Sequence, residues 1–211
     1  MNATINGTHA MQTPQVNNLL YPLSIHDKDI LAIYPYGSHV YGTNTINSDE
    51  DYIVVVKDDI SIPNDTIKIN EQIDMTIYNE NSFIDKIKQH EISILECLFL
   101  PKGQTEYNIN YSDYFVLDLS KLRSSLSAKA SNSFVKAKKK IAKGDFYIGR
   151  KSLWHSFRII MFGIQIAKHR KIIDYTVANY LYDDIVNNKD KSKYLGLHNQ
   201  LMTEFRTLAP K

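Results

Sequence analysis

The fold is decided by one stretch, which reads Gly37-Ser38-His39-Val40-Tyr41-Gly42-Thr43-Asn44-Thr45-Ile46-Asn47-Ser48-Asp49-Glu50-Asp51. An apolar run at residues 30–34 precedes it and is typical of a buried strand. Gly37 and Ser38 leave that strand and begin a short helix, whose free backbone N–H groups attract a phosphate. Because Gly37 has no side chain, a phosphate can approach the backbone closely. The stretch therefore predicts a phosphate-binding turn between a strand and a helix.

Acidic residues follow on two further predicted strands. Residues 49–56 are β-branched and aromatic, and side chains alternate along a strand, so Asp49 and Asp51 share one face. Glu50 points to the other face and is left out of the candidate site. Residues 67–78 alternate as a third strand, with Asp74 on its polar face. An Asp-x-Asp pair alone is common on surface strands, but three such carboxylates favour a site for hard cations.

The rest of the chain is predicted to be mostly helical. Asn81 and Ser82 are expected to cap a helix through residue 88. Residues 91–100 fit either a strand or a helix that stops at Pro101, and a short helix is favoured. From about residue 113 a 3.6-residue period predicts three or four helices. The fold class is therefore α+β, a small mixed β-sheet with flanking helices followed by a C-terminal helical bundle. The expected divisions are a flexible tail at 1–22, a catalytic core at 23–112, and a helical region at 113–211 that completes the cleft.

Composition excludes several classes of protein. The chain has 211 residues, of which 43% are hydrophobic and 23% charged, so a globular fold is expected. The single cysteine, Cys97, excludes an internal disulfide and a cysteine-based zinc site, and is interpreted as a core residue. Neither a secretory signal nor a membrane-spanning run is apparent, which predicts a cytoplasmic protein that does not contact the membrane.

Charge is unevenly distributed along the chain. Residues 129–171 have a net charge of +11, whereas the remainder has −9. This segregation suggests that the basic segment meets a polyanion and that the acidic segment collects cations. Within the basic segment, a nucleic-acid backbone is the expected partner of Lys136, Lys139, Lys140 and Lys143. A solvated helix face is the alternative.

The order of these motifs resembles the nucleotidyltransferase superfamily typified by DNA polymerase beta. More narrowly, Gly37-Ser38-x-x-Tyr41-Gly42 with Ser48-Asp49-x-Asp51 resembles the small stand-alone nucleotidyltransferases of RNA repair pathways. The resemblance covers residues 30–80. It implies nucleotide binding by Gly37, Ser38 and Ser48, and catalysis on two Mg²⁺ or Mn²⁺ ions by Asp49, Asp51 and Asp74. Asp74 either binds the metal that activates the attacking hydroxyl or accepts its proton.

A second part of the resemblance lies on a helix predicted at about residues 149–168. Lys151, His155 and Arg158 fall at i, i+4 and i+7, and so form one polar stripe on an otherwise apolar helix. The resemblance implies that Lys151 and Arg158 neutralise the nucleotide triphosphate, while His155 donates a hydrogen bond to a phosphate or orients a carboxylate. The alternative is a set of structural ion pairs with acids such as Glu91 or Asp145.

The activity that the resemblance implies is transfer of a nucleoside monophosphate from a nucleoside triphosphate to an acceptor hydroxyl, with release of pyrophosphate. The basic segment favours a polynucleotide acceptor, RNA above all, and the short chain favours template-independent addition. Residues 52–56 replace the glycine-containing continuation usual in the narrower group, which leaves the acceptor open. A protein or a small molecule is the alternative acceptor, as in antitoxin-type or aminoglycoside-modifying relatives. A non-catalytic nucleic-acid-binding module is the other alternative.

Overall fold

The computed structural model describes residues 19–62, 66–101, 103–105, 109–187 and 192–211. It divides the chain into two compact units, and each is considered by itself. The first unit comprises the residues up to Val40, Asn44–Phe83 and Pro101–Asn110. The second comprises Tyr41–Thr43, Ile84–Leu100 and Tyr111–Lys211. The two units therefore alternate along the sequence.

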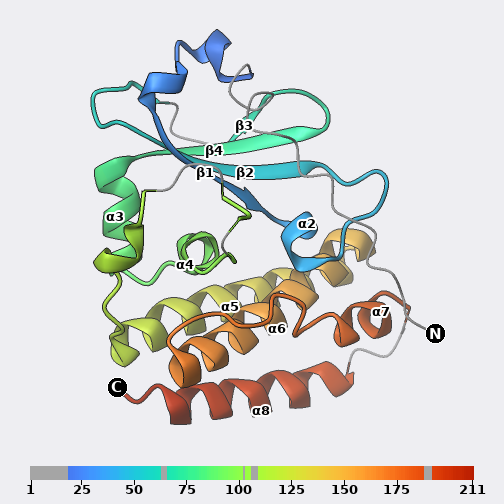
Figure 1. Ribbon diagram of the computed structural model, residues 1–211. Helices are drawn as coiled ribbons and strands as arrows, with labels where there is room; N and C mark the ends of the chain where they lie inside the picture. Colours follow the sequence, from blue (N-terminus) through green and yellow to red (C-terminus); the bar gives the residue numbers. More distant parts are fainter. Residues whose placement is uncertain (1–18, 63–65, 102, 106–108, 188–191) are drawn as a thin grey trace, which may run out of the picture. The chain divides into compact units, whose positions relative to one another are not determined.

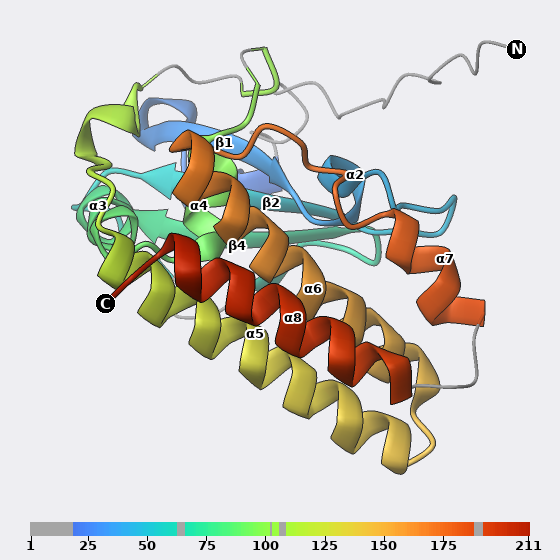
Figure 2. The same ribbon diagram turned by 90° about the horizontal axis from the view of Figure 1, so that it is seen from below.

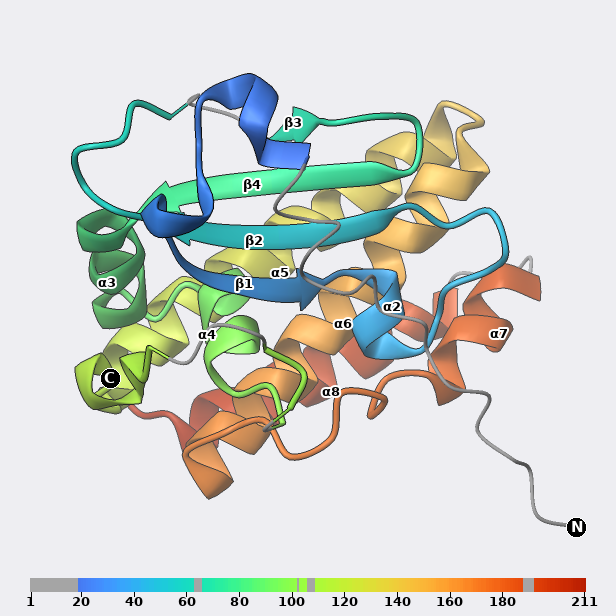
Figure 3. The same ribbon diagram turned by 45° about the horizontal axis from the view of Figure 1, so that its top comes forward.

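The first unit is built on a four-stranded mixed sheet. Its strands are β1 (Ile30–Tyr36), β2 (Glu50–Val56), β3 (Ile67–Lys68) and β4 (Ile73–Asn79), in the spatial order β1-β2-β4-β3 (Figures 1 and 3). β1 and β2 pair antiparallel, β2 and β4 pair parallel, and β3 returns antiparallel to β4. The predicted mixed sheet is thus confirmed, with β2 at its centre between β1 and β4.

One face of this sheet carries the core of the first unit. Alternate residues of β2 and β4 form it, together with Leu20 and Ile25 from the segment before β1: Tyr52, Val54, Val56, Ile73, Met75 and Ile77. The predicted alternation of both strands is confirmed. Each fully buried aliphatic side chain here contributes roughly 1.5–3 kcal/mol. Leu20 and the first two residues of the 3₁₀ helix η1 (Tyr21–Leu23) fall in the range expected to be a tail, yet Leu20 is fully buried. Residues 1–18 lie outside the described chain.

The expectation of a single strand over residues 67–78 is wrong. The segment folds into a hairpin, because the backbone reverses between β3 and β4. The Asn70 side-chain carbonyl accepts the N–H of Gln72 at 2.8 Å, and the N–H of Ile69 donates to the carbonyl of Ile73 at 2.9 Å. An Asn side chain that satisfies its own backbone two residues on stabilises a tight turn.

The cap of helix α3 (Glu80–Lys88) also differs from the prediction. The helix begins at Glu80, so Asn81 and Ser82 lie within it rather than before it. Asp58, in the loop after β2, accepts the backbone N–H of Asn81 at 2.9 Å and its side-chain amide at 2.7 Å. The free N–H at the helix start is therefore satisfied by a residue 23 positions earlier in the chain.

The second unit is helical, as predicted. It contains α4 (Ile92–Leu98), α5 (Leu119–Ala142), α6 (Phe146–His169), α7 (Tyr180–Asn187) and α8 (Ser192–Leu208). Figure 2 shows α5, α6 and α8 side by side, and α6 contacts α5, α7 and α8. α6 is buried on nearly all sides, which confirms the interpretation of its sequence. No helix in the described parts of the chain is long and apolar enough to cross a membrane.

Replacing Asp58 by Ala tests the distant cap. We expect the free energy of unfolding to fall by about 1 kcal/mol, the usual cost of losing an N-terminal cap. The exposed neighbour provides the matched control, because Asp59→Ala removes the same charge from the same loop. Urea unfolding of both variants measures the difference. Equal stability of the two variants would contradict the assignment of Asp58 as the cap.

Candidate active site

The sheet brings two of the predicted carboxylates together. Asp51 of β2 and Asp74 of β4 are direct partners in the parallel ladder. Residues paired in this way point to the same face of the sheet, which here is the face opposite Tyr52 and Met75. Asp51 and Asp74 are both half-buried. Two carboxylates therefore lie side by side, and a cation would relieve their mutual repulsion.

Gly37 is packed directly against one of these carboxylates. It follows β1 with a φ of +76°, in the left-handed region that favours glycine. A Cβ added at Gly37 would lie 2.0 Å from Oδ2 of Asp51 and 2.8 Å from its Cγ. The missing side chain thus leaves the space that the Asp51 carboxylate occupies. The helix α2 (Ser38–Tyr41) begins at the next residue, which confirms the predicted strand, glycine turn and short helix.

The loop before β2 is organised around Ser48. Its hydroxyl accepts the N–H of Thr45 at 2.8 Å, and its own N–H donates to the carbonyl of Thr45 at 3.0 Å. Ser48 thereby closes a turn that leads directly into Asp49, which precedes β2 and is half-buried. The Glu50 carboxylate has a different partner, because it accepts a hydrogen bond from the hydroxyl of Tyr52 at 2.6 Å. A role of Ser48 in nucleotide binding stays a prediction.

A complete metal-ligand cluster is not preassembled. Among the residues that the structure describes, no three His, Cys, Asp or Glu side chains are gathered closely enough to hold a metal ion. Asp74 has a cationic neighbour in Lys68, whose ammonium lies 3.9 Å from Oδ1. The Lys68 side chain is 74% exposed, so this ion pair contributes little to stability. The carboxylate of Asp74 therefore remains open to a stronger cation.

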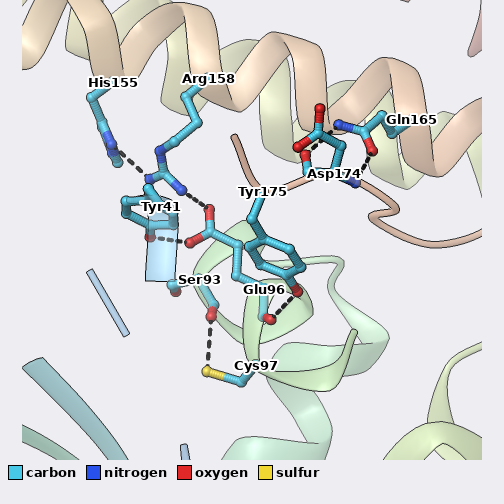
Figure 4. Close-up of polar contacts among 9 residues, drawn as sticks. All are labelled: Tyr41, Ser93, Glu96, Cys97, His155, Arg158, Gln165, Asp174 and Tyr175. Carbon is cyan, nitrogen blue, oxygen red and sulfur yellow. Dashed lines mark hydrogen bonds and ion pairs between the residues drawn. The ribbon is translucent and has the colours of Figure 1, made fainter. Parts of the chain in front are cut away.

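The polar stripe on α6 divides into an exposed end and a buried end. Lys151 is exposed, whereas the side chain of Arg158 is fully buried. The Arg158 guanidinium donates to Oε1 of Glu96 at 2.7 Å and to Nδ1 of His155 at 2.8 Å (Figure 4). For Arg158, the structure shows the structural ion pair of the alternative, with Glu96 as the acid. Roles of Lys151 and His155 in phosphate binding stay predictions. The two acids considered from the sequence are engaged elsewhere, Glu91 with Lys86 and Asp145 with Lys140.

Glu96 is the residue that the sequence reasoning missed. It is the single charged residue within the apolar run at residues 92–100, and only 1% of its surface is exposed. A charge inside an apolar helix needs a partner, as does Arg158 within α6. The sequence therefore shows two buried charges of opposite sign, Glu96 and Arg158, each of which needs a partner. Cys97 beside it is buried, as expected, and its thiol donates to the carbonyl of Ser93 at 3.4 Å.

His155 is held in its neutral form. Burial is the main cause that moves its pKa well below the ordinary value, and the positive charge of Arg158 adds to the effect. Further contributions come from Lys129, Lys136 and Lys151. The imidazole therefore lies among cations from both α5 and α6.

The four lysines that were predicted to contact nucleic acid lie along α5 and at its C-terminal cap. They line an open hollow of about 440 Å³ together with Asn132 and Val135. Three of them are exposed to solvent: Lys136, Lys139 and Lys143. Lys140 is paired with Asp145 at 2.9 Å. We call the residues lining this hollow the lysine face.

Comparison with known proteins assigns a class to residues 23–118. Residues 23–118 match the family model described as the nucleotidyltransferase domain. The chain contains a nucleotidyltransferase domain. Gly37, Ser38, Ser48 and the three candidate carboxylates all fall inside the matched range of this nucleotidyltransferase, whereas Lys151, His155, Arg158 and the lysine face lie beyond it. The prediction of a nucleotidyltransferase enzyme is confirmed, and the narrower resemblance to RNA repair enzymes stays a prediction.

No curated protein matches the chain. A similar solved structure is that of the nucleotidyltransferase-like protein from Exiguobacterium sibiricum, which is 11% identical. The match covers 94% of this chain and 74% of that chain with a TM-score of 0.35.

Substituting Gly37 by Ala tests the contact with Asp51. A matched control is Gly144→Ala, because Gly144 has a similar φ of +80° but open space where the Cβ would lie. We expect Gly144→Ala to cost about 1 kcal/mol of stability, from backbone strain alone. Gly37→Ala adds the collision with Asp51, so we expect it to cost at least about 2 kcal/mol and to abolish nucleotidyl transfer. Equal losses of stability in the two variants, with transfer retained, would refute the contact.

Stability is expected to decrease in mild acid because of three histidines. Burial is the main cause that lowers the pKa of His90, His155 and His198. His90 also needs its neutral form, since Nε2 accepts the N–H of Asp118 at 3.0 Å. The unfolded chain takes up protons as the pH falls through about 6.5, whereas the folded chain resists until lower pH. The free energy of unfolding therefore falls by up to about 1.4 kcal/mol per pH unit for each histidine in that window.

Urea unfolding between about pH 8 and pH 5 measures this slope. His198→Gln is expected to flatten it, whereas the control His169→Gln, at an exposed position, leaves it unchanged. A stability that stays level across this range in the unmodified protein would contradict the assignment.

Proposed function

We propose that this nucleotidyltransferase transfers a nucleoside monophosphate from a nucleoside triphosphate to a hydroxyl at the end of a polynucleotide, with Mg²⁺ bound at Asp51 and Asp74. The observation that supports this best is the direct pairing of the two carboxylates across β2 and β4, beside Gly37, inside the nucleotidyltransferase domain. In this reaction the acceptor oxygen bonds to the α-phosphorus, the bond from that phosphorus to the bridging oxygen breaks, and pyrophosphate leaves.

The donor set fits magnesium. Mg²⁺ is usually held by one or two carboxylates and takes its remaining ligands from substrate phosphates and water, so a three-residue cluster is not needed beforehand. Asp51 and Asp74 would hold the ion, with Asp49 completing the set when the nucleotide is present. When bound, the ion neutralises charge on the phosphate oxygens. The protein's part is to keep the two carboxylates in register, and Gly37 helps by leaving space for Asp51.

Phosphate binding is proposed separately for two sets of donors, one in each unit. The first is the turn at Gly37 and Ser38, which leads into α2, and the first backbone N–H groups of a helix have no partner within that helix. The second is Lys151 and His155 of α6, an exposed ammonium and a half-buried imidazole. Arg158 is left out of direct phosphate contact, because its side chain is fully buried and bonded to Glu96 and His155.

The lysine face supports a polynucleotide as the acceptor. Lys136 and Lys139 of α5 and Lys143 at its C-terminal cap are exposed, and they line a hollow whose lining residues include no acid. Neutralising backbone phosphates by such lysines releases counterions, which supplies affinity without reading the base sequence. Addition of one or a few nucleotides without a template is therefore the proposed reaction, and RNA is the proposed acceptor.

Incubation with α-labelled nucleoside triphosphates, Mg²⁺ and a mixture of RNA, DNA and the protein itself tests the proposal. We expect label on RNA, and a loss of about a thousandfold or roughly 4 kcal/mol of barrier in Asp51→Asn and in Asp74→Asn. Glu50→Gln is the matched control, because Glu50 neighbours Asp51 in β2 but is held by Tyr52. We expect this control to retain full activity.

The destination of the label separates the alternatives. Label on the polypeptide or on a small molecule would replace the proposed acceptor, and extension that requires a paired template would refute template independence. Bound nucleotide without any transfer would support the non-catalytic module. Activity in Asp51→Asn within about tenfold of the unmodified protein would contradict the proposed site.

A further inference from the structure

A buried polar network in the second unit is centred on Glu96 of α4 (Figure 4). The carboxylate accepts a hydrogen bond from Arg158 at Oε1 and another from the Tyr41 hydroxyl at Oε2. The main-chain carbonyl of Glu96 accepts the hydroxyl of Tyr175 at 2.5 Å. Both carboxylate oxygens are therefore engaged, and the side chain has a defined orientation.

The guanidinium of Arg158 is equally constrained. Besides its bonds to Glu96 and His155, its central carbon lies 3.6 Å from the ring centroid of Tyr41. Trp154 and Phe162 flank it at 5.7 and 5.1 Å. A planar cation between aromatic rings and a carboxylate has little freedom to rotate. The Nη2 atom of Arg158 is thus held where it meets the imidazole.

This contact determines the protonation pattern of His155. A guanidinium can only donate hydrogen bonds, so Nδ1 of His155 must accept and carries no proton. A neutral imidazole has one ring proton, which therefore lies on Nε2. The cations that lower the pKa of the ring are Arg158 and Lys151 from α6, and Lys129 and Lys136 from α5. Glu96 balances the charge of Arg158, so the three lysines make the environment of an N–H donor positive.

We propose that Glu96 is a positioning residue for phosphate binding: through Arg158 it fixes His155 as the neutral tautomer whose Nε2–H donates to a phosphate oxygen. The lysines that surround the ring from α5 and α6 attract the same phosphate. The inference rests on the proposed function for the source of that phosphate, which is the triphosphate of the nucleotide. Arg158 thus acts on the nucleotide through His155 rather than by direct contact.

The test separates this role from a purely structural one. Removing only one partner would leave a buried charge unpaired and endanger the fold, whereas Glu96→Leu combined with Arg158→Met removes both charges together. Replacing a buried ion pair by apolar side chains of similar size often preserves stability. Tyr175→Phe is the matched control, since it deletes a hydroxyl that binds the Glu96 carbonyl and leaves the carboxylate untouched.

Two measurements near neutral pH use the full chain. Nitrogen-15 NMR of the imidazole rings distinguishes the two neutral tautomers, with His155→Gln identifying the His155 signals. Titration calorimetry with inorganic triphosphate, without metal or acceptor, measures affinity. We expect the Nε2–H tautomer in the unmodified protein and in Tyr175→Phe, and mixed tautomers with at least about tenfold weaker binding in the double variant.

A second pair of variants leaves the ion pair intact. A glutamine amide reaches the position of Nε2, whereas an asparagine amide reaches that of Nδ1. His155→Gln is therefore expected to retain more of the triphosphate affinity than His155→Asn. Equal affinity of these two variants would overturn the proposal, even if the double variant failed to fold.

The remaining outcomes are equally decisive. A folded double variant with unchanged triphosphate affinity and an unchanged His155 tautomer would refute the role of Glu96. In the unmodified protein, a proton on Nδ1 of His155 or a lack of triphosphate binding would refute it too. Neither the NMR measurement nor the calorimetry involves nucleotidyl transfer. A failure of the proposed transfer reaction can therefore be told apart from a failure of this inference. An inactive enzyme that binds triphosphate as described would refute only the transfer reaction, whereas an active one with a tautomer independent of Glu96 would refute only the inference.

Discussion

The register between β2 and β4 is the constraint on which the rest of the site depends. It pairs Asp51 with Asp74, and at the same time it pairs Tyr52 with Met75 on the opposite face. A slip of one residue would exchange the two faces of a strand, and so would bury a carboxylate in the core. The apolar residues around Leu20 and Ile25 therefore do more than stabilise the sheet. Their burial keeps the two carboxylates side by side on the other face.

The helical unit is constrained differently, because it contains two buried charged side chains. Arg158 and Glu96 are 0% and 1% exposed, and neither would be tolerated there alone. Their pairing leaves both Glu96 oxygens and two nitrogens of Arg158 with partners, and one of those partners is His155. Such a pair adds little net stability compared with apolar side chains, but it imposes one arrangement on its neighbours. That is the property required of a residue that orients a hydrogen-bond donor.

Much of the fold could be predicted because its signals are local. Alternation along β2 and β4, the glycine turn after β1 and the 3.6-residue period beyond residue 113 each follow from neighbouring residues. The predictions of the α3 cap and of a single strand over residues 67–78 were wrong because another residue's hydrogen bonds outweighed the local pattern. Asn81 has the chemistry of a cap, but Asp58 from a distant loop takes that role. Residues 67–78 alternate like one strand, but Asn70 turns the chain back within them.

The order of strand, glycine turn, short helix and acidic strand follows from the amino-acid sequence alone, and so does the nucleotidyltransferase class. Those features depend on backbone preferences and on side-chain alternation over a few residues. The acid that pairs with Arg158 depends instead on long-range packing. Glu96 lies 62 residues away in sequence, and its choice over Glu91 or Asp145 follows from which helices pack together. Long-range packing selects one partner among several acids of equal chemistry, and no local pattern encodes that selection.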